Sequence, residues 1–285
     1  MDVRTFPDGE TYLRYENSLE GSEVLVVADW HRPNRQFLPA VYAAKTAREL
    51  GASSVGVVAP YLPYMRQDSR FRPGEAVTSR YFSELISRDF DWLVTAEPHL
   101  HRYGTLDGLY TIPARAVRAT EAIGRWIADH VDAPLLVGPD EESEQWVSAA
   151  ADVGDMPTLI LEKVRRGDYD VEIEGVLQGK ERLGHQPVLI DDIISTGRTM
   201  VEAVRWIRDA GLAAPICIGI HGLFSDGARD KLDAAGVKQV VTCNTVPHPT
   251  NAIDISDELV AGVGALLSSE ELIEPPVEES GVSPG

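Results

Sequence analysis

Residues 188–200, which read VLIDDIISTGRTM, combine a pair of acids with a run of small and hydroxyl residues. An apolar run delivers Asp191 and Asp192, and a turn follows that opens directly into a helical segment. Small residues let backbone N–H groups approach an anion closely, and the start of a helix adds partial positive charge. The two carboxylates can accept hydrogen bonds from vicinal sugar hydroxyls, directly or through hydrated Mg²⁺. The spacing predicts a sugar-phosphate site whose turn consists of Ser195, Thr196, Gly197, Arg198 and Thr199.

The elements around this turn alternate between short β-branched runs and helical segments. Continuous apolar runs of this length are typical of parallel strands that are covered on both faces. The helical segments 37–50 and 200–210 are each followed by a glycine, which can take the left-handed cap conformation. The alternation predicts an α/β fold with open, mostly parallel sheets flanked by helices. The predicted strands are 24–29, 54–60, 91–97, 134–140, 158–164, 187–192, 215–222 and 239–245.

Four of the predicted strands end in carboxylates, namely Asp29, Glu97, Asp140 and the Asp191–Asp192 pair. In open parallel sheets, ligands bind beyond the carboxyl ends of the strands. A single acid at such a position is as often a helix cap, whereas a double acid is a stronger signal of a binding site. We therefore expect the ligand-binding edge to lie at these strand ends.

The length of 285 residues favours two such α/β units in tandem. The segment TIPARAVRAT contains a proline and precedes a helical segment rich in small residues, which predicts a seam near residue 115. Residues 1–115 then form the first domain and residues 116–272 the second. Residues 273–285 are acidic and proline-rich without periodicity, which predicts a disordered tail.

Charge and composition exclude several classes of function. Lysine and arginine total 26 against 45 acids, so the net charge of −19 repels nucleic acid and anionic membranes. No run of apolar residues is long enough to span a bilayer. Two distant cysteines and the lack of a basic-then-apolar leader indicate a cytoplasmic protein. Strong surface acidity, with arginine exceeding lysine, favours a halophilic, salt-adapted protein over an ordinary acidic enzyme.

Six further motifs extend over most of the chain. They are FPDGE at 6–10, YMRQDSRFRPGEAVTSR at 64–80, EPHLHR at 97–102, VGPD at 137–140, LEKVRR at 161–166 and HGLFSDGA at 221–228. Residues 188–200 resemble the 5-phosphoribosyl 1-diphosphate (PRPP) binding motif of type I phosphoribosyltransferases. The seven stretches together resemble the ribose-phosphate pyrophosphokinase (PRPP synthase) family, and the archaeal members in particular. The resemblance implies two tandem type I phosphoribosyltransferase-like domains that transfer diphosphate from ATP to C1 of ribose 5-phosphate.

The same resemblance implies where ATP binds. Residues 66–68 form a polar cluster after a strand and a tight turn, and they are suited to hold nucleotide phosphates and base edges. The FPDGE segment completes the adenine pocket in the family, often that of a neighbouring subunit, which implies a homo-oligomer. The residues assigned to ATP are Phe6, Asp8, Gly9, Glu10, Arg66, Gln67 and Asp68.

The family pattern further implies a metal site and a catalytic pair. His99 and Asp140 would bind Mg²⁺. Lys163 and Arg165 would be catalytic, since cations near the transferred group stabilise charge on phosphate oxygens. Arg165 would also contact ribose 5-phosphate, together with the acid pair and the turn after it. The polar segment 166–175 is interpreted as a flap that excludes water on closing.

Two departures from the family pattern affect these expectations. Glu97 stands where the family has an aspartate two residues before the histidine, and its longer arm could shift the metal. Family members also carry about one further strand and helix before FPDGE, so a shortened amino terminus is expected to expose apolar sheet surface. Two alternatives therefore remain beside the synthase: a non-catalytic regulatory paralogue, and a phosphoribosyltransferase, which would explain residues 188–200 but not the duplicated half.

Overall fold

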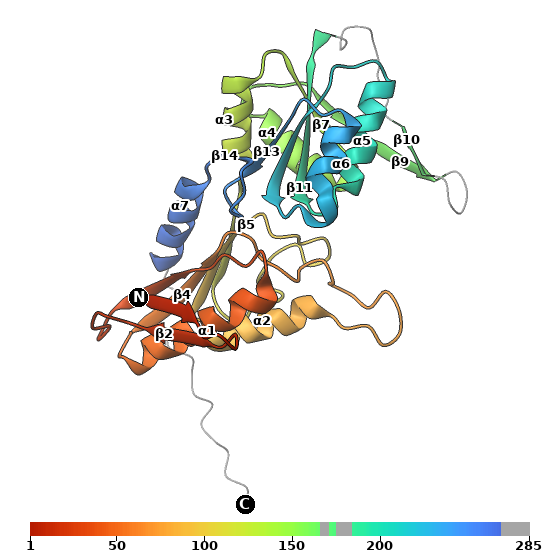
Figure 1. Cartoon of the computed structure of the whole chain (residues 1–285). Coiled ribbons are helices and arrows are strands. Elements are labelled where there is room, and N and C mark those ends of the chain that lie inside the picture. The colour runs from red at the N-terminus through yellow and green to blue at the C-terminus, as the bar shows by residue number, and fades with distance from the viewer. Residues whose placement is uncertain (166–170, 175–183, 269–285) are drawn as a thin grey trace, which may run out of the picture.

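Two parallel β-sheets, each flanked by helices, make up the computed structural model of the chain, which describes residues 1–165, 171–174 and 184–268. In Figure 1 the sheet formed by the first half of the chain lies below and the sheet of the second half lies above. The predicted α/β architecture of two open, parallel sheets is confirmed.

The first sheet has four parallel strands, in the order β3 (Glu23–Val27), β4 (Ser54–Ala59), β5 (Trp92–Ala96) and β6 (Ala114–Val117). Two helices, α1 (Pro33–Glu49) and α2 (Thr78–Asp89), pack on this half of the molecule. The buried face of α1 is a stripe of alanines, and such small side chains let the helix approach the sheet closely. The core beneath the helices includes Trp30, Phe82 and Phe90, whose rings meet edge to face.

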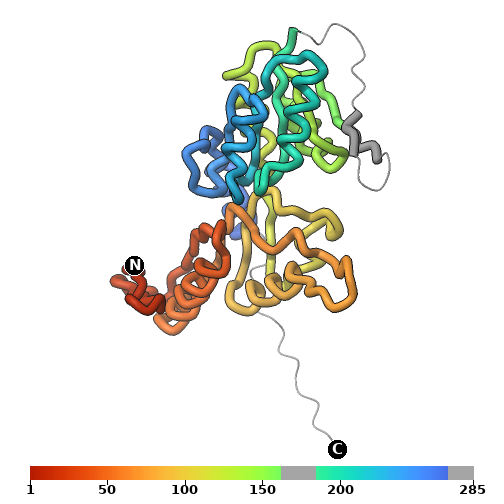
Figure 2. The backbone as a smooth tube through the Cα atoms, turned by 45° about the vertical axis from the view of Figure 1, so that its right-hand side comes forward, coloured from red at the N-terminus to blue at the C-terminus, as the bar shows by residue number. Residues whose placement is uncertain are grey.

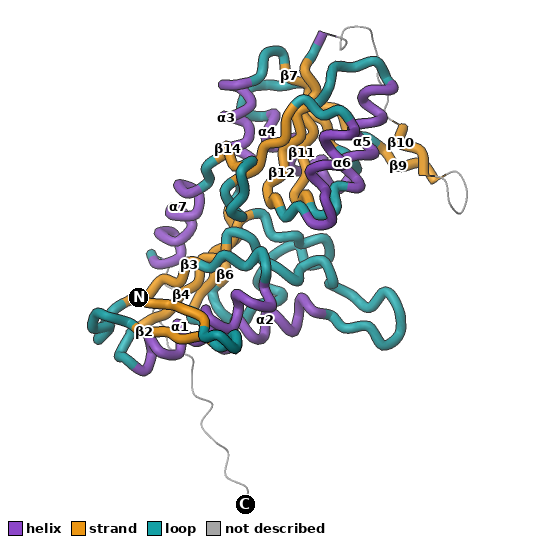
Figure 3. Tube along the Cα trace, in the orientation of Figure 1, coloured by secondary structure: helices purple, strands orange, loops and turns teal. Residues whose placement is uncertain are grey.

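The second sheet has six parallel strands. Their order is β14 (Asn251–Ile253), β13 (Gln239–Cys243), β12 (Ile216–Gly222), β11 (Gln186–Ile194), β7 (Pro134–Gly138) and β8 (Thr158–Ile160). Side chains alternate across the central strand, so that Val188 and Ile190 join one core cluster while Leu189 joins another. Helices α3 (Thr120–His130) and α4 (Glu144–Ala151) contribute to the first cluster, and α5 (Arg198–Asp209) and α6 (Ala228–Ala235) to the second (Figure 3).

Two antiparallel hairpins extend beyond the sheets. One joins β1 (Asp2–Thr5) and β2 (Thr11–Arg14), and its turn holds the FPDGE motif. The other joins β9 (Glu162–Arg165) and β10 (Val171–Glu174). The segment interpreted as a flap, 166–175, therefore contains a strand, and its remaining residues lie outside the described part of the chain, as does the predicted disordered tail 273–285.

The last helix, α7 (Ser256–Leu267), returns to the first sheet and packs on β5 and β6 (Figure 1). A Cβ atom on Gly262 would lie 2.5 Å from Cγ1 of Val117, so only glycine permits this approach. The predicted domain boundary near residue 115 assigns α7 to the second domain, whereas the helix packs on the sheet of the first. Residue 115 itself lies within β6. The chain thus crosses between the halves twice.

Most predicted strands correspond to observed ones, but local patterns missed the short and exposed elements. The strands β1, β2, β6, β10 and β14 have three or four residues each. The helices start earlier than predicted, α1 at Pro33 and α5 at Arg198, so Arg198 and Thr199 belong to the first turn of α5.

Among the described residues, no helix has both the length and the apolar character required to cross a membrane.

Candidate active site

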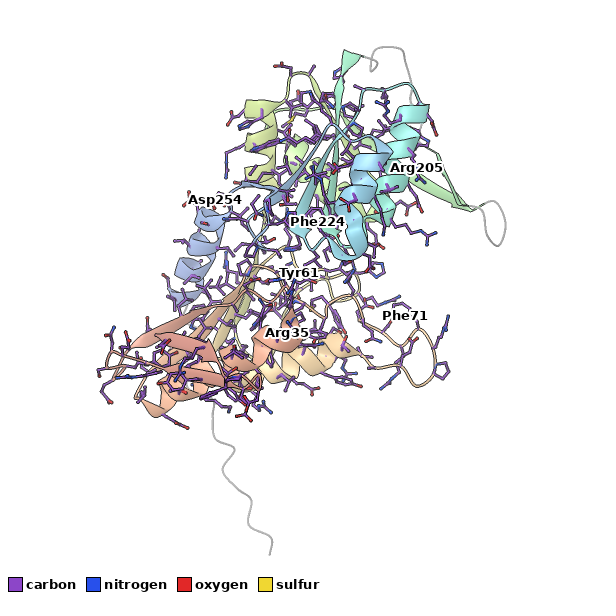
Figure 4. The ribbon with its side chains drawn as sticks, in the orientation of Figure 1. Arg35, Tyr61, Phe71, Arg205, Phe224 and Asp254 are labelled. Atoms are coloured by element: carbon purple, nitrogen blue, oxygen red, sulfur yellow. The ribbon has the colours of Figure 1, made fainter. Side chains whose placement is uncertain are left out.

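The carboxyl ends of the two sheets meet at the junction between the halves. His99 follows β5 of the first sheet, and its Nδ1 lies 2.7 Å from Oδ2 of Asp192 on β11 of the second sheet. Figure 4 labels Tyr61 and Phe224 near this junction, one from each half of the chain. Asp192 therefore lies where the two halves face each other, and Glu97 reaches Trp146 of the second half at the same junction.

The contact between His99 and Asp192 changes the protonation of the imidazole. The hydrogen bond to the carboxylate raises the pKa of His99, although partial burial of the ring acts in the opposite direction. Asp192 itself is buried. A charged imidazolium at His99 compensates the charge of this buried carboxylate. This pairing was not predicted, because the two residues are 93 positions apart in the sequence.

The turn after β11 has the geometry of an anion site. Gly197 precedes α5 with φ of 72°, a left-handed conformation that glycine adopts without strain. No described side chain caps the start of α5, and the first N–H groups of a helix have no partner within the helix. Ser195 Oγ lies 3.1 Å from Ser225 Oγ, which fixes the turn against the loop after β12. Such a turn offers backbone N–H groups and hydroxyls that can bind an anion.

Two charged residues of the 188–200 motif, Arg198 and Asp191, make different contacts. The Arg198 side chain is 86% exposed and pairs with Glu202 at 3.0 Å, so it points away from the turn. Asp191 Oδ1 accepts the backbone N–H of Asp192 at 3.0 Å, which orients the carboxylate pair at the end of β11.

A cavity of about 640 Å³ spans the two halves beside this turn. Arg66 and Gln67 line it from the first half, and Ser195 lines it from the second. Asp68 is not among the lining residues, because its carboxylate lies 3.4 Å from Arg102 Nε and its backbone carbonyl accepts from the Tyr103 hydroxyl. The other lining residues are His31, Arg32, Pro33, Tyr61, Pro63, Tyr64, Thr78, Leu223, Phe224 and Ser225.

The carboxylate of Glu97 accepts hydrogen bonds from the second half of the chain. Its Oε1 accepts the backbone N–H of Ala119 at 3.0 Å and its Oε2 accepts Trp146 Nε1 at 3.2 Å. Burial raises the pKa of Glu97. Both oxygens thus have protein donors, and Glu97 acts as a brace for the loop that carries His99. A second cavity of about 420 Å³ lies between this loop and α4.

A buried histidine completes the connection between the sheets. His221 is the penultimate residue of β12, its Nε2 lies 3.2 Å from the Glu97 carbonyl, and its Nδ1 lies 2.9 Å from Thr245 Oγ1. The ring packs against Tyr61 with centroids 5.0 Å apart. Burial lowers the pKa of His221. This role is not predicted from the sequence, although His221 is a polar residue near the end of an otherwise apolar run, ICIGIHG, and the first residue of the motif HGLFSDGA.

Other predicted site residues lie apart from this junction or outside the described side chains. Phe6, Asp8, Gly9 and Glu10 belong to the turn of the β1–β2 hairpin, at the outer end of the first half (Figures 1 and 2), and none lines the 640 Å³ cavity. Within one chain they are therefore not brought together with Arg66 and Gln67. Lys163 and Arg165 lie on β9, and their side chains are outside the described part of the structure.

The predicted metal residues are near the junction but do not form a dedicated cage. Asp140 follows β7 and begins the short 3₁₀ turn Glu141–Ser143, and its backbone N–H lies 3.3 Å from Ser143 Oγ. His99 is bonded to Asp192. Among the described residues, no group of three or more His, Cys, Asp or Glu side chains is spaced to hold a metal. Mg²⁺ bound with a substrate needs only one or two carboxylates beside phosphate oxygens and water, and the acids at these strand ends satisfy that requirement.

Comparisons with known proteins agree with this architecture. Residues 1–88 match the model of the N-terminal domain of ribose phosphate pyrophosphokinase, and residues 109–258 match that of the phosphoribosyl transferase domain. The ribose-phosphate pyrophosphokinase of Methanopyrus kandleri is 34% identical over 90% of this chain and 88% of its own length. That of Sulfolobus acidocaldarius is 32% identical, over 90% and 88% respectively.

A solved structure supports the same assignment. The crystal structure of phosphoribosylpyrophosphate synthetase from Mycobacterium smegmatis superposes with a TM-score of 0.78 and 25% identity, over 93% of this chain and 89% of that one. Both the sequence and the arrangement of the two halves are therefore shared along nearly the whole length. The chain belongs to the ribose-phosphate pyrophosphokinase family.

Proposed function

We propose that the chain catalyses transfer of the β,γ-diphosphate of ATP to the C1 hydroxyl of ribose 5-phosphate, which yields PRPP and AMP. The observation that carries this proposal is the 640 Å³ cavity, because it joins Ser195 of the phosphate turn to Arg66 and Gln67 of the other half. A reaction between a sugar phosphate and a nucleotide needs both to be held in one cleft.

The sugar phosphate is assigned to the second half. The turn from Ser195 to Thr199 binds the 5-phosphate through backbone N–H groups and hydroxyls at the start of α5. Asp191 and Asp192 accept hydrogen bonds from the ribose hydroxyls, which orients C1 toward the cleft. Binding of the sugar then competes with His99 for Asp192.

The nucleotide is assigned to the opposite wall. Arg66 supplies planar donors for phosphate oxygens, and Gln67 can pair with a base or ribose edge. The C1 oxygen forms a bond to the β-phosphorus while the bond from that phosphorus to the α,β-bridging oxygen breaks. AMP leaves with the bridging oxygen, and the proton of the C1 hydroxyl is released to solvent. Catalysis of such a transfer consists mainly of positioning and charge neutralisation, which suits a cleft lined by cations and hydroxyls.

Mg²⁺ and the two basic residues of β9 complete the proposal. The carboxylates at the strand ends, with Asp140 and His99 from the family pattern, would hold Mg²⁺ that is shared with the substrate phosphates, and the ion would neutralise charge on the transferred group. Lys163 and Arg165 are assigned to the same charge on the basis of the family motif. Their place on a hairpin, rather than in the sheet, is compatible with approach to a bound substrate.

The proposal is tested by incubating the purified chain with ATP, Mg²⁺ and ribose 5-phosphate and measuring PRPP and AMP. In the Asp191→Asn variant we expect the KM for ribose 5-phosphate to rise more than the KM for ATP, because Asp191 is assigned to the sugar. Equal increases would indicate a general role in metal binding. A chain that forms no PRPP but stimulates a second synthase would be the regulatory paralogue.

A further inference from the structure

An Asp–His pair follows the carboxyl end of β3, and its acid, Asp29, is one of the strand-end carboxylates that no family motif includes. His31 Nδ1 lies 2.8 Å from Asp29 Oδ1, and the backbone N–H of His31 donates to the same oxygen at 3.3 Å. Gln36 Nε2, from the first turns of α1, lies 3.4 Å from the other carboxylate oxygen. Since a carboxylate only accepts hydrogen bonds, the imidazole proton on Nδ1 is held by Asp29 and the ring has a fixed orientation.

The ring of this pair faces the cavity shared by the two halves. His31 lines the 640 Å³ cavity together with Arg66 and Gln67, and Ser195 and Phe224 lie on the opposite wall. The side chains of His31 and Asp29 are 30% and 39% exposed, so a solute can reach them. No described group hydrogen-bonds Nε2 of His31. With Nδ1 tied back to Asp29, the edge that carries Nε2 is the part of the ring left for a ligand.

The charge of the cavity indicates what that ligand is. Arg32 and Arg66 both line it, whereas no carboxylate is found among its described lining residues. In a chain with a net charge of −19, a cavity with two guanidinium groups and an imidazole is a local reversal of sign. Such a cavity favours a polyanion. With Nδ1 held by Asp29, the Nε2 edge of the ring is turned to the cavity, and an imidazolium there can donate Nε2–H to a phosphate oxygen.

We propose that His31, oriented by Asp29, is a further binding residue for the polyphosphate of the nucleotide substrate. The inference rests on the proposed function, because it places the nucleotide in the cavity that Arg66 and Gln67 line. It assigns His31 to the β- and γ-phosphates rather than to the base, and it makes Asp29 a positioning residue. Neither residue belongs to the motifs that carry the family resemblance.

Ligand affinity tests the proposal without relying on turnover. Titration calorimetry of the full chain with Mg²⁺–ATP, inorganic tripolyphosphate and AMP compares the wild type with His31→Ala, His31→Gln and Asp29→Ala. We expect His31→Ala to weaken the binding of ATP and of tripolyphosphate by roughly tenfold to a hundredfold, the loss of one hydrogen bond to a charged group. AMP should bind unchanged. Asp29→Ala should weaken ATP less, because it frees the ring without removing it, and His31→Gln should restore part of the affinity.

The control is His130→Ala, which removes an imidazole from the end of α3, away from the cavity. It should leave all three affinities unchanged. Unchanged ATP affinity in His31→Ala overturns the proposal, and so does an equal loss for AMP, which would place the ring on the nucleoside. A His31→Ala protein that melts earlier and binds ribose 5-phosphate equally poorly would show a structural role instead. A wild type that binds no ATP overturns the inference, whereas one that binds ATP without forming PRPP overturns only the proposed function.

Discussion

Trp146 Nε1 donates to Glu97 Oε2 at 3.2 Å, which joins a helix of the second half to the loop that delivers His99 from the first. The same carboxylate accepts the backbone N–H of Ala119. Both carboxylate oxygens of Glu97 therefore accept hydrogen bonds from the protein, and the glutamate side chain is long enough to reach Trp146 on α4. An aspartate at this position would fall short of the indole.

Removal of the indole donor should weaken this brace. Trp146→Phe keeps most of the packing but leaves a buried carboxylate oxygen without its partner, so we expect a loss of about 1–3 kcal/mol in the free energy of unfolding. Urea denaturation measures it. Trp126→Phe is the matched control, because Trp126 is a partly buried indole on α3 that stacks on His130. Similar losses of unfolding free energy in both variants would show that the effect comes from packing and not from the hydrogen bond to Glu97.

The imidazole of His99 should be required for turnover. His99→Ala removes the group that faces the buried acid across the two halves, and we expect kcat to fall by roughly a hundredfold or more. Initial rates at saturating substrates measure this. His101→Ala is the control, because that ring is 43% exposed and pairs with Glu142 rather than with the acid pair. Loss of equal size in both variants would contradict a specific role for His99.

The buried His221 should make stability depend on pH. The unfolded chain binds a proton on this histidine near pH 6.5, its ordinary pKa, whereas burial lowers the pKa in the folded state. Between these two values the unfolded state holds more protons, so stability is lost as pH falls below about 6.5.

His221→Gln removes this dependence while it retains a side-chain donor near the Glu97 carbonyl. Urea denaturation at pH 7.5 and at pH 5.5, roughly one unit to either side of the ordinary value, measures the difference in unfolding free energy between wild type and variant. We expect the difference to shrink at the lower pH. A difference that stays constant or grows would mean that folded His221 is protonated.

The phosphate turn and the strand-end acids were predictable because strand, turn and helix follow each other within thirteen residues, 188–200. Three contacts were not predictable in this way: the hydrogen bond of Glu97 with Trp146, the contact of His99 with Asp192, and the contact of His221 with the Glu97 carbonyl. Each of these pairs depends on how one sheet is placed against the other, and no local pattern encodes that placement. The position of α7 on the first sheet was missed for the same reason.

The location of FPDGE predicts that activity needs assembly. This turn lies on the outer hairpin and not at its own chain's cavity, so it can complete an ATP site only in a neighbouring subunit. We expect specific activity to fall on dilution as subunits separate. Light scattering at each enzyme concentration provides the parallel measure of mass. Constant specific activity in a purely monomeric sample would contradict this arrangement.

The acidic surface predicts stabilisation by salt. With 45 acids against 26 basic residues, the folded chain repels itself, and added ions screen this repulsion. We expect the thermal unfolding midpoint to rise as potassium chloride is increased toward saturation. A midpoint that stays level or falls would show that the chain is an ordinary acidic protein without adaptation to salt.

The proposed activity is defined by transfer of a diphosphate, and not of a single phosphate, from nucleotide to sugar. Phosphorus NMR of the chain with ATP, Mg²⁺ and ribose 5-phosphate follows every phosphate group in one sample. We predict that AMP and PRPP accumulate one for one while ATP and ribose 5-phosphate disappear, and that ADP does not form. Formation of ADP with a ribose bisphosphate, or persistence of both substrates with an assembled wild-type protein, would contradict the account.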